Sequence, residues 1–100
     1  MTLPTIEELE ELYPNVIAEM DEKFDSHDFI LKLAQGHQRL YVQALSECVA
    51  DDRPFKIVHG LIARRLVNFP ELVKRTGTQV SKDIFLQDES ATTWVKQKEL

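Results

Sequence analysis

The chain has 100 residues, which is the size of one small domain. It is 43% hydrophobic and 29% charged, with three glycines, four prolines and one cysteine. This composition excludes a collagen-like, low-complexity or largely disordered chain, and a single cysteine excludes an internal disulfide framework and a thiolate metal cluster. No segment is long and apolar enough to be predicted as a membrane span. The acidic N-terminal sequence lacks the basic start of a signal peptide, so we expect a cytoplasmic protein in a reducing compartment.

The net charge of −5 is unevenly distributed along the chain. Residues 1–28 hold nine acidic side chains and one basic one, whereas residues 29–81 hold eight basic and four acidic ones. Residues 82–100 hold three basic and four acidic side chains. This layout is typical of a solvated acidic segment packed on a mildly basic body. It also leaves open a basic face that contacts an anion or an acidic partner.

The first 25 residues are predicted as an acidic N-terminal segment that is kinked at Pro14. Thr5 and Glu8 have the spacing of a capping box, in which each side chain satisfies a free amide at the start of a helix. This spacing predicts a first helix over about 5–12. Pro14 either kinks that helix or begins a second one over about 14–23, because proline is tolerated in a first helical turn.

The strongest helical pattern in the chain comes next. Asp25 and Ser26 suit the N-cap position. From there, apolar residues recur at three- and four-residue steps as far as Val49. This pattern predicts one long central helix over about 26–50. Gly36 lies inside it, and an interior glycine is costly enough to suggest a close helix crossing.

The second half of the chain is divided by prolines. Pro54 suits the first turn of a further amphipathic helix, and Pro70 ends that helix. A short helix over 71–75 is predicted next, so the helical core covers residues 26–75. Residues 76–100 are predicted as an irregular loop plus a short C-terminal helix.

These elements together predict an all-α fold. No stretch alternates apolar and polar residues over the length of a strand, and no unit of 20–50 residues repeats. We therefore expect a compact single-domain bundle of four to six helices over residues 1–100. Its interior is expected to come from two amphipathic helices, 26–50 and 54–69, that lie against each other.

The histidines and the cysteine are the first candidates for chemistry. His27, His37 and His59 are ten and twenty-two residues apart, without the short spacing that zinc sites use, so no metal is predicted. His37 is expected to be buried and hydrogen-bonded on the apolar helix face, and His27 to belong to a helix start. Cys48 lies on the apolar stripe, which predicts an inert thiol with a raised pKa.

Catalytic motifs are not found in the sequence. It contains no P-loop, no G-x-S-x-G element and no G-x-G-x-x-G fingerprint. The paired glutamates near the N-terminus are predicted to be exposed, and exposed carboxylates do little acid–base work. We therefore expect no catalytic residue, no cofactor and no enzyme, and an enzyme is ranked a distant third.

Two binding functions are ranked above an enzyme. A protein-interaction or regulatory role comes first, through a protein partner or a homodimer, because a wide apolar helix face and eight aromatic residues offer surplus apolar surface. A nucleic-acid-associated regulator that uses the basic region 53–75 comes second. The candidate contacts with an anion or nucleic acid are Arg53, Lys56, His59, Arg64, Lys74 and Arg75. A solvated surface is the simpler interpretation of these charges, so nucleic acid is not favoured.

Overall fold

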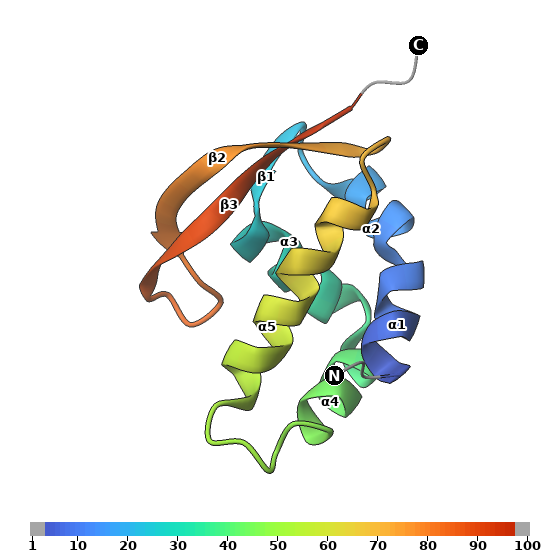
Figure 1. Cartoon of the computed structure of the whole chain (residues 1–100), viewed down its shortest axis with the longest axis vertical. Coiled ribbons are helices and arrows are strands. Elements are labelled where there is room, and N and C mark those ends of the chain that lie inside the picture. The colour runs from blue at the N-terminus through green and yellow to red at the C-terminus, as the bar shows by residue number, and fades with distance from the viewer. Residues whose placement is uncertain (1–3, 98–100) are drawn as a thin grey trace.

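The computed structural model describes residues 4–97 and has a mixed α+β fold (Figure 1). The elements in chain order are α1 (Pro4–Glu11), α2 (Tyr13–Glu19), β1 (Lys23–Asp25), α3 (Ser26–Gly36), α4 (Gln38–Ser46), α5 (Pro54–Arg64), the 3-10 helix η1 (Arg65–Asn68), β2 (Val73–Lys82) and β3 (Asp88–Lys96). The strands form one antiparallel sheet in the order β1-β3-β2. Within the described residues, none of the helices has the length and apolar character needed to cross a membrane.

The prediction of an all-α bundle is therefore wrong. Strands β2 and β3 form a long hairpin where a helix over 71–75, an irregular loop and a C-terminal helix were expected. Trp94 is buried in β3, where it lies opposite Phe24 of β1 and Arg75 of β2. Strand β2 is exposed along almost its whole length. It consequently lacks the alternation of apolar and polar residues that identifies a strand in a sequence.

The long central helix over 26–50 is also wrong, because the chain divides it in two. His37 leaves the helical region, with φ −137° and ψ 57°, so α3 ends at Gly36 and α4 begins after His37. No neighbouring part of the chain lies within 4 Å of where a Cβ on Gly36 would be, so this glycine does not mark a close helix crossing. His37 is half-buried at the junction rather than buried on an apolar face.

The signals that begin the first three helices have different outcomes. The break at Pro14 is confirmed, because that proline lies in the first turn of α2. The capping box at Thr5 is wrong: Thr5 lies inside α1, and its hydroxyl donates to the carboxylate of Glu47 instead. The N-cap at Asp25 is confirmed. Its carboxylate accepts the backbone N–H of Asp28 at 2.9 Å, and the Asp28 carboxylate accepts the backbone N–H of Asp25 at 3.1 Å.

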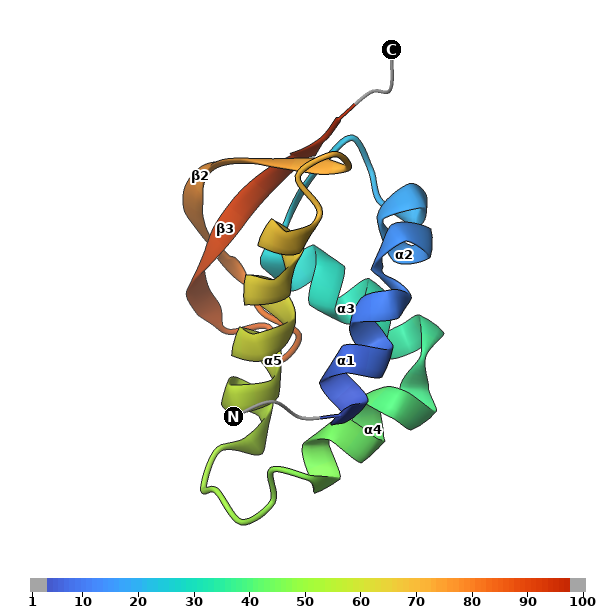
Figure 2. The ribbon, with the colours of Figure 1, turned by 45° about the vertical axis from the view of Figure 1, so that its right-hand side comes forward.

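One hydrophobic core joins the helices to the sheet. Tyr13, Phe29 and Leu33 have no exposed surface, and the ring centroids of Tyr13 and Phe29 lie 4.7 Å apart. Trp94 brings β3 into the same cluster. Figures 1 and 2 show α1 beside α4, on the side of the helical layer away from the sheet.

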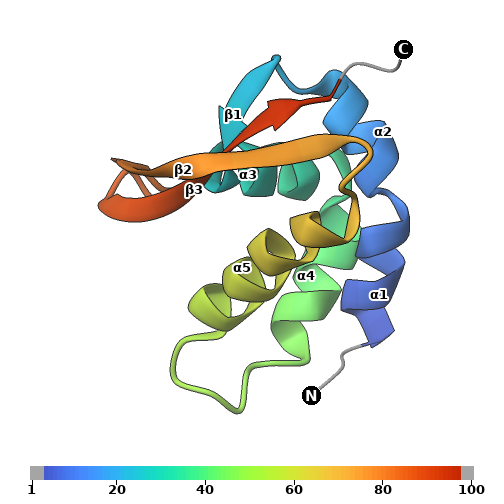
Figure 3. The same ribbon diagram turned by 45° about the horizontal axis from the view of Figure 1, so that its top comes forward.

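The outer half of the β2–β3 hairpin extends beyond the third strand. Strand β1 pairs with β3 only at residues 93–95, whereas β2 pairs with β3 as far as residue 88. A register shift between Arg75 and Gly77 interrupts the pairing of β2 with β3, and such bulges bend a hairpin. Figure 3 shows the hairpin lying over α5, and residues of both elements line the cleft described next.

Candidate functional site

A cleft opens between α5 and the β2–β3 hairpin. Its volume is about 570 Å³, within the range of ligand-sized pockets. The lining residues come from the start of α3, from α5 and the turn before it, and from the end of the hairpin. Segments far apart in the chain therefore form its walls.

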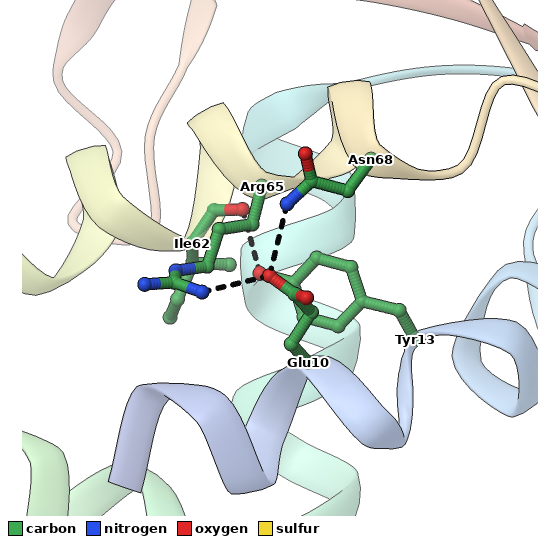
Figure 4. Close-up of polar contacts among 5 residues, drawn as sticks. All are labelled: Glu10, Tyr13, Ile62, Arg65 and Asn68. Atoms are coloured by element: carbon green, nitrogen blue, oxygen red, sulfur yellow. Dashed lines mark hydrogen bonds and ion pairs between the residues drawn. The ribbon is translucent and has the colours of Figure 1, made fainter. Parts of the chain in front are cut away.

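Polar contacts fix α5, which forms one wall, against the N-terminal helices (Figure 4). The Tyr13 hydroxyl donates to the backbone oxygen of Ile62 at 2.6 Å. Burial raises the pKa of Tyr13 far above its usual range, so this donor stays protonated. The Glu10 carboxylate accepts hydrogen bonds from Arg65 at 2.8 Å and from Asn68 at 3.1 Å. The Tyr13 contact holds α5 itself, and the two Glu10 contacts hold η1, which directly continues α5.

The hairpin loop over residues 83–87 forms the opposite wall and is organised by Asp83. The Asp83 carboxylate accepts backbone N–H bonds from Phe85 at 2.8 Å and from Gln87 at 3.0 Å. These bonds, that of Gln87 first, hold the pKa of Asp83 below its ordinary value. Leu86 at the tip has φ 64°, a left-handed conformation that is unfavourable for a bulky side chain. The Asp83 hydrogen bonds therefore fix the backbone of this loop in one defined conformation.

Aromatic rings from the two walls meet in the cleft. The ring centroids of Phe55 and Phe85 lie 4.9 Å apart at 90°. The ring of His59 lies 5.8 Å from Phe55 and 6.3 Å from Phe85. Despite these contacts, Phe55 is 40% exposed and Phe85 is 52% exposed. Exposed aromatic side chains beside a cavity are typical of an interaction surface.

Tyr41 and His59 are joined by a hydrogen bond at the back of this wall. Burial raises the pKa of Tyr41 to about 12, so its hydroxyl stays protonated, and the hydroxyl oxygen lies 2.5 Å from Nε2 of His59. Burial lowers the pKa of His59, against the opposite effect of the Asp83 carboxylate. His59 is therefore a neutral aromatic part of the wall, and the geometry favours this role over an anion contact.

We expect acidification to destabilise the protein through His59. Its pKa in the folded protein lies below the value of about 6.5 in an unfolded chain. Between these two values the unfolded state binds more protons, so the free energy of unfolding falls as the pH drops below about 6.5, by at most about 1.4 kcal/mol per pH unit. Urea denaturation from about pH 7.5 to about pH 5.5 measures this slope. The variant His59→Gln should reduce it; a slope unchanged in His59→Gln would contradict the assignment. His37→Gln, outside the cleft, is the matched control.

The two walls carry charges of different sign. The α5 side contributes Asp52, Arg53 and Lys56, and the hairpin side contributes Asp83 and Glu89. Within residues 4–97, none of these five side chains forms an ion pair closer than 4.0 Å. Their charges are consequently available to a bound molecule, with a net positive wall facing a negative one.

The six basic and histidine candidates do not form one basic face. Three of them line this cleft: Arg53, Lys56 and His59. Arg64 is exposed on α5, where its Nε donates to the backbone oxygen of Gly60 at 3.1 Å. Lys74 and Arg75 lie on β2 and line a separate cavity of about 280 Å³. The structure therefore divides the candidate set among three places.

His27 is a part of the site that the sequence reading did not assign. Its Nδ1 lies 2.7 Å from the hydroxyl oxygen of Ser81, which joins the start of α3 to β2. The neighbouring Asp25 carboxylate accepts a hydrogen bond from Nε2 of Gln79 at 3.1 Å. These two contacts brace the start of α3 against β2, beside the cleft.

The remaining chemical candidates contribute little to the cleft. Cys48 is buried, and burial raises the pKa of its thiol, which is the direction predicted from its place on the apolar stripe. In the described part of the chain, no group of three or more histidine, cysteine or acidic side chains is placed to hold a metal ion. The aromatic rings and the charged side chains are therefore the chemistry that the cleft offers.

Comparison with known proteins found no match to this chain among protein-family models, curated proteins or solved structures. The geometry of the cleft is accordingly the basis for assigning a function.

Proposed function

We propose that this chain is a protein-interaction domain that binds a segment of a partner protein in the cleft between α5 and the β2–β3 hairpin. The observation that carries the proposal is the pair Phe55 and Phe85, which lie on opposite walls with their rings in contact and both remain about half-exposed. Aromatic side chains supply large apolar contact areas and are enriched among residues that dominate binding.

Both walls are organised before a partner arrives, which supports the proposal. The hydrogen bonds of Asp83 define the hairpin loop, and those of Tyr13 and Glu10 fix α5 and the 3-10 helix η1 that continues it. Little conformational entropy is then lost on binding. The cavity accommodates a bulky apolar side chain of the partner.

The charges of the cleft indicate the residues that flank this anchor. An acidic residue on one side of it matches Arg53 and Lys56, and a basic residue on the other side matches Asp83 and Glu89. Nucleic acid fits the same cleft less well, because these two carboxylates repel phosphate groups.

A peptide library displayed on phage and selected against the folded protein tests this proposal. We expect the enriched peptides to carry a bulky apolar residue and to bind at least about tenfold more weakly to Phe85→Ala, a loss of about 1.4 kcal/mol. The matched control is Val42→Ala, which changes an exposed side chain of α4 outside the cleft and should leave the affinity unchanged.

Two results would overturn the proposal. One is a set of selected peptides that bind Phe85→Ala as tightly as the unaltered chain. The other is failure to enrich any peptide while a single-stranded oligonucleotide binds in a manner that Phe85→Ala abolishes. Circular dichroism of each variant verifies that it is folded.

A further inference from the structure

We infer that the partner segment seated in this cleft is the hairpin tip of a second copy of the chain, so that two copies clasp each other about a two-fold axis. This inference rests on the proposed function, because it names the occupant of the same cleft. A two-fold contact requires one surface to carry both a protruding element and the recess that receives it. The cleft and the adjoining hairpin tip meet this requirement.

The protruding element is the tip of the hairpin. Leu86 is 77% exposed there, beside the half-exposed ring of Phe85. Hairpin tips usually consist of small or polar residues, and glycine or asparagine adopts a positive φ at lower cost than leucine. The Asp83 hydrogen bonds nevertheless hold Leu86 at φ 64°. A large apolar side chain is thus presented to solvent in an unfavourable backbone conformation, where a contact from outside the chain would offset the cost.

The recess is the cleft itself. Apolar side chains of Ile30, Pro54 and Ala63 line it together with the two phenylalanines. Its volume of about 570 Å³ is ample for a leucine side chain and part of its loop. Insertion of Leu86 from a second copy would remove apolar surface on both chains from water. Because the contact occurs twice about the two-fold axis, the buried apolar area is doubled.

The charges are self-complementary in the same arrangement. The hairpin end carries Asp83 and Glu89, and the start of α5 carries Arg53 and Lys56 beside one acidic side chain, Asp52, so that its net charge is positive. In a two-fold pair, the acidic tip of each copy faces the basic start of α5 in the other. The net charge of −5 on each chain opposes association at long range. We therefore expect a dissociation constant in the micromolar range that depends on salt.

Analytical ultracentrifugation of the full chain between about 1 µM and about 1 mM tests for the dimer. The mass should rise from one chain to two across this range. Leu86→Gly is the informative variant, because glycine adopts the positive φ of the tip without strain and the variant should fold at least as stably. It should weaken the dimer at least about tenfold, whereas Val42→Ala, outside the cleft, should not change it.

A mixing experiment shows whether the charged contacts run between chains. Lys56→Glu and Glu89→Lys should each be monomeric, because both contacts across the two-fold axis then join like charges. An equimolar mixture of the two variants should recover a dimer. In the mixed pair, positions 56 and 89 of different chains carry opposite charges at both contacts. An effect within one chain would persist on mixing.

The outcomes separate this inference from the proposed function. If the chain stays monomeric but binds selected peptides through Phe85, the inference that a second copy occupies the cleft is overturned and the proposed function stands. A dimer that neither Leu86→Gly nor the charge reversals weaken also overturns it. A monomer that binds no peptide overturns both.

Discussion

Replacing Phe29 with alanine should lower the free energy of unfolding by about 3–5 kcal/mol. Phe29 has no exposed surface, and its ring lies 4.7 Å from that of Tyr13 and 6.2 Å from that of Phe24. It therefore packs α3 against both α2 and β1, and alanine would leave a cavity that these elements cannot close. A domain of this size has only about 5–15 kcal/mol of stability in total, so the variant should approach unfolding at room temperature.

Urea denaturation followed by circular dichroism measures this change. The matched control is Leu31→Ala on the same helix, whose side chain is 43% exposed and should cost far less than the Phe29 variant. A loss below about 1 kcal/mol in Phe29→Ala would show that Phe29 is not central to the core.

The second large effect is expected at Tyr13. The variant Tyr13→Phe keeps the buried ring but removes the hydroxyl that donates to the backbone oxygen of Ile62. A buried hydrogen bond lost in this way costs about 1–3 kcal/mol, because the remaining polar group loses its partner without gaining water. The same denaturation experiment measures the loss. If the Tyr13→Phe variant proved as stable as the unaltered chain, this hydrogen bond would not have the stabilising role assigned to it.

Tyr13 also connects the core to the cleft. Since its hydroxyl fixes α5 from the far side, Tyr13→Phe should weaken binding in the cleft although Tyr13 does not line it. Tyr41→Phe provides the comparison. It removes a hydroxyl that contacts His59 within the wall, and so should alter the pH dependence of stability more than the position of α5.

Local signals in the sequence predicted most helix starts. Pro14 and Pro54 lie in first helical turns, and Asp25 is an N-cap, because each of these preferences depends on the residue's own backbone or side chain. The division at His37 was missed. The sequence there offers no proline, and Gly36 alone was consistent with a continuous helix.

The hairpin could not be predicted from the pattern of its residues. Strand β2 is exposed on both faces over most of its length, so its stability comes from pairing with β3 and not from an apolar alternation. Trp94 lies in the region over 76–100 that was predicted as a loop plus a short C-terminal helix, but it belongs to β3. A buried tryptophan fits either element, and only the long-range pairing decides between them.

The candidate site was predicted in part. Arg53, Lys56 and His59 were singled out for their charge, and they do line the cleft. Asp83 and Phe85 were not predicted as site residues, because they come from a loop that reaches α5 only through the bend of the hairpin. The apolar run from Ile84 to Leu86 between turn-forming residues was the available signal.

NMR chemical shifts of the backbone amides in the ¹⁵N-labelled chain test most directly whether the cleft is a binding surface. They are recorded in one titration with a selected peptide and in another with rising protein concentration. The predicted result is a set of shifts at Ser26 and His27, from Phe55 to His59, and from Asp83 to Ser90. Shifts centred instead on Lys74 and Arg75 or on the outer faces of α1 and α4, or no shifts at all, would contradict a binding role for this cleft.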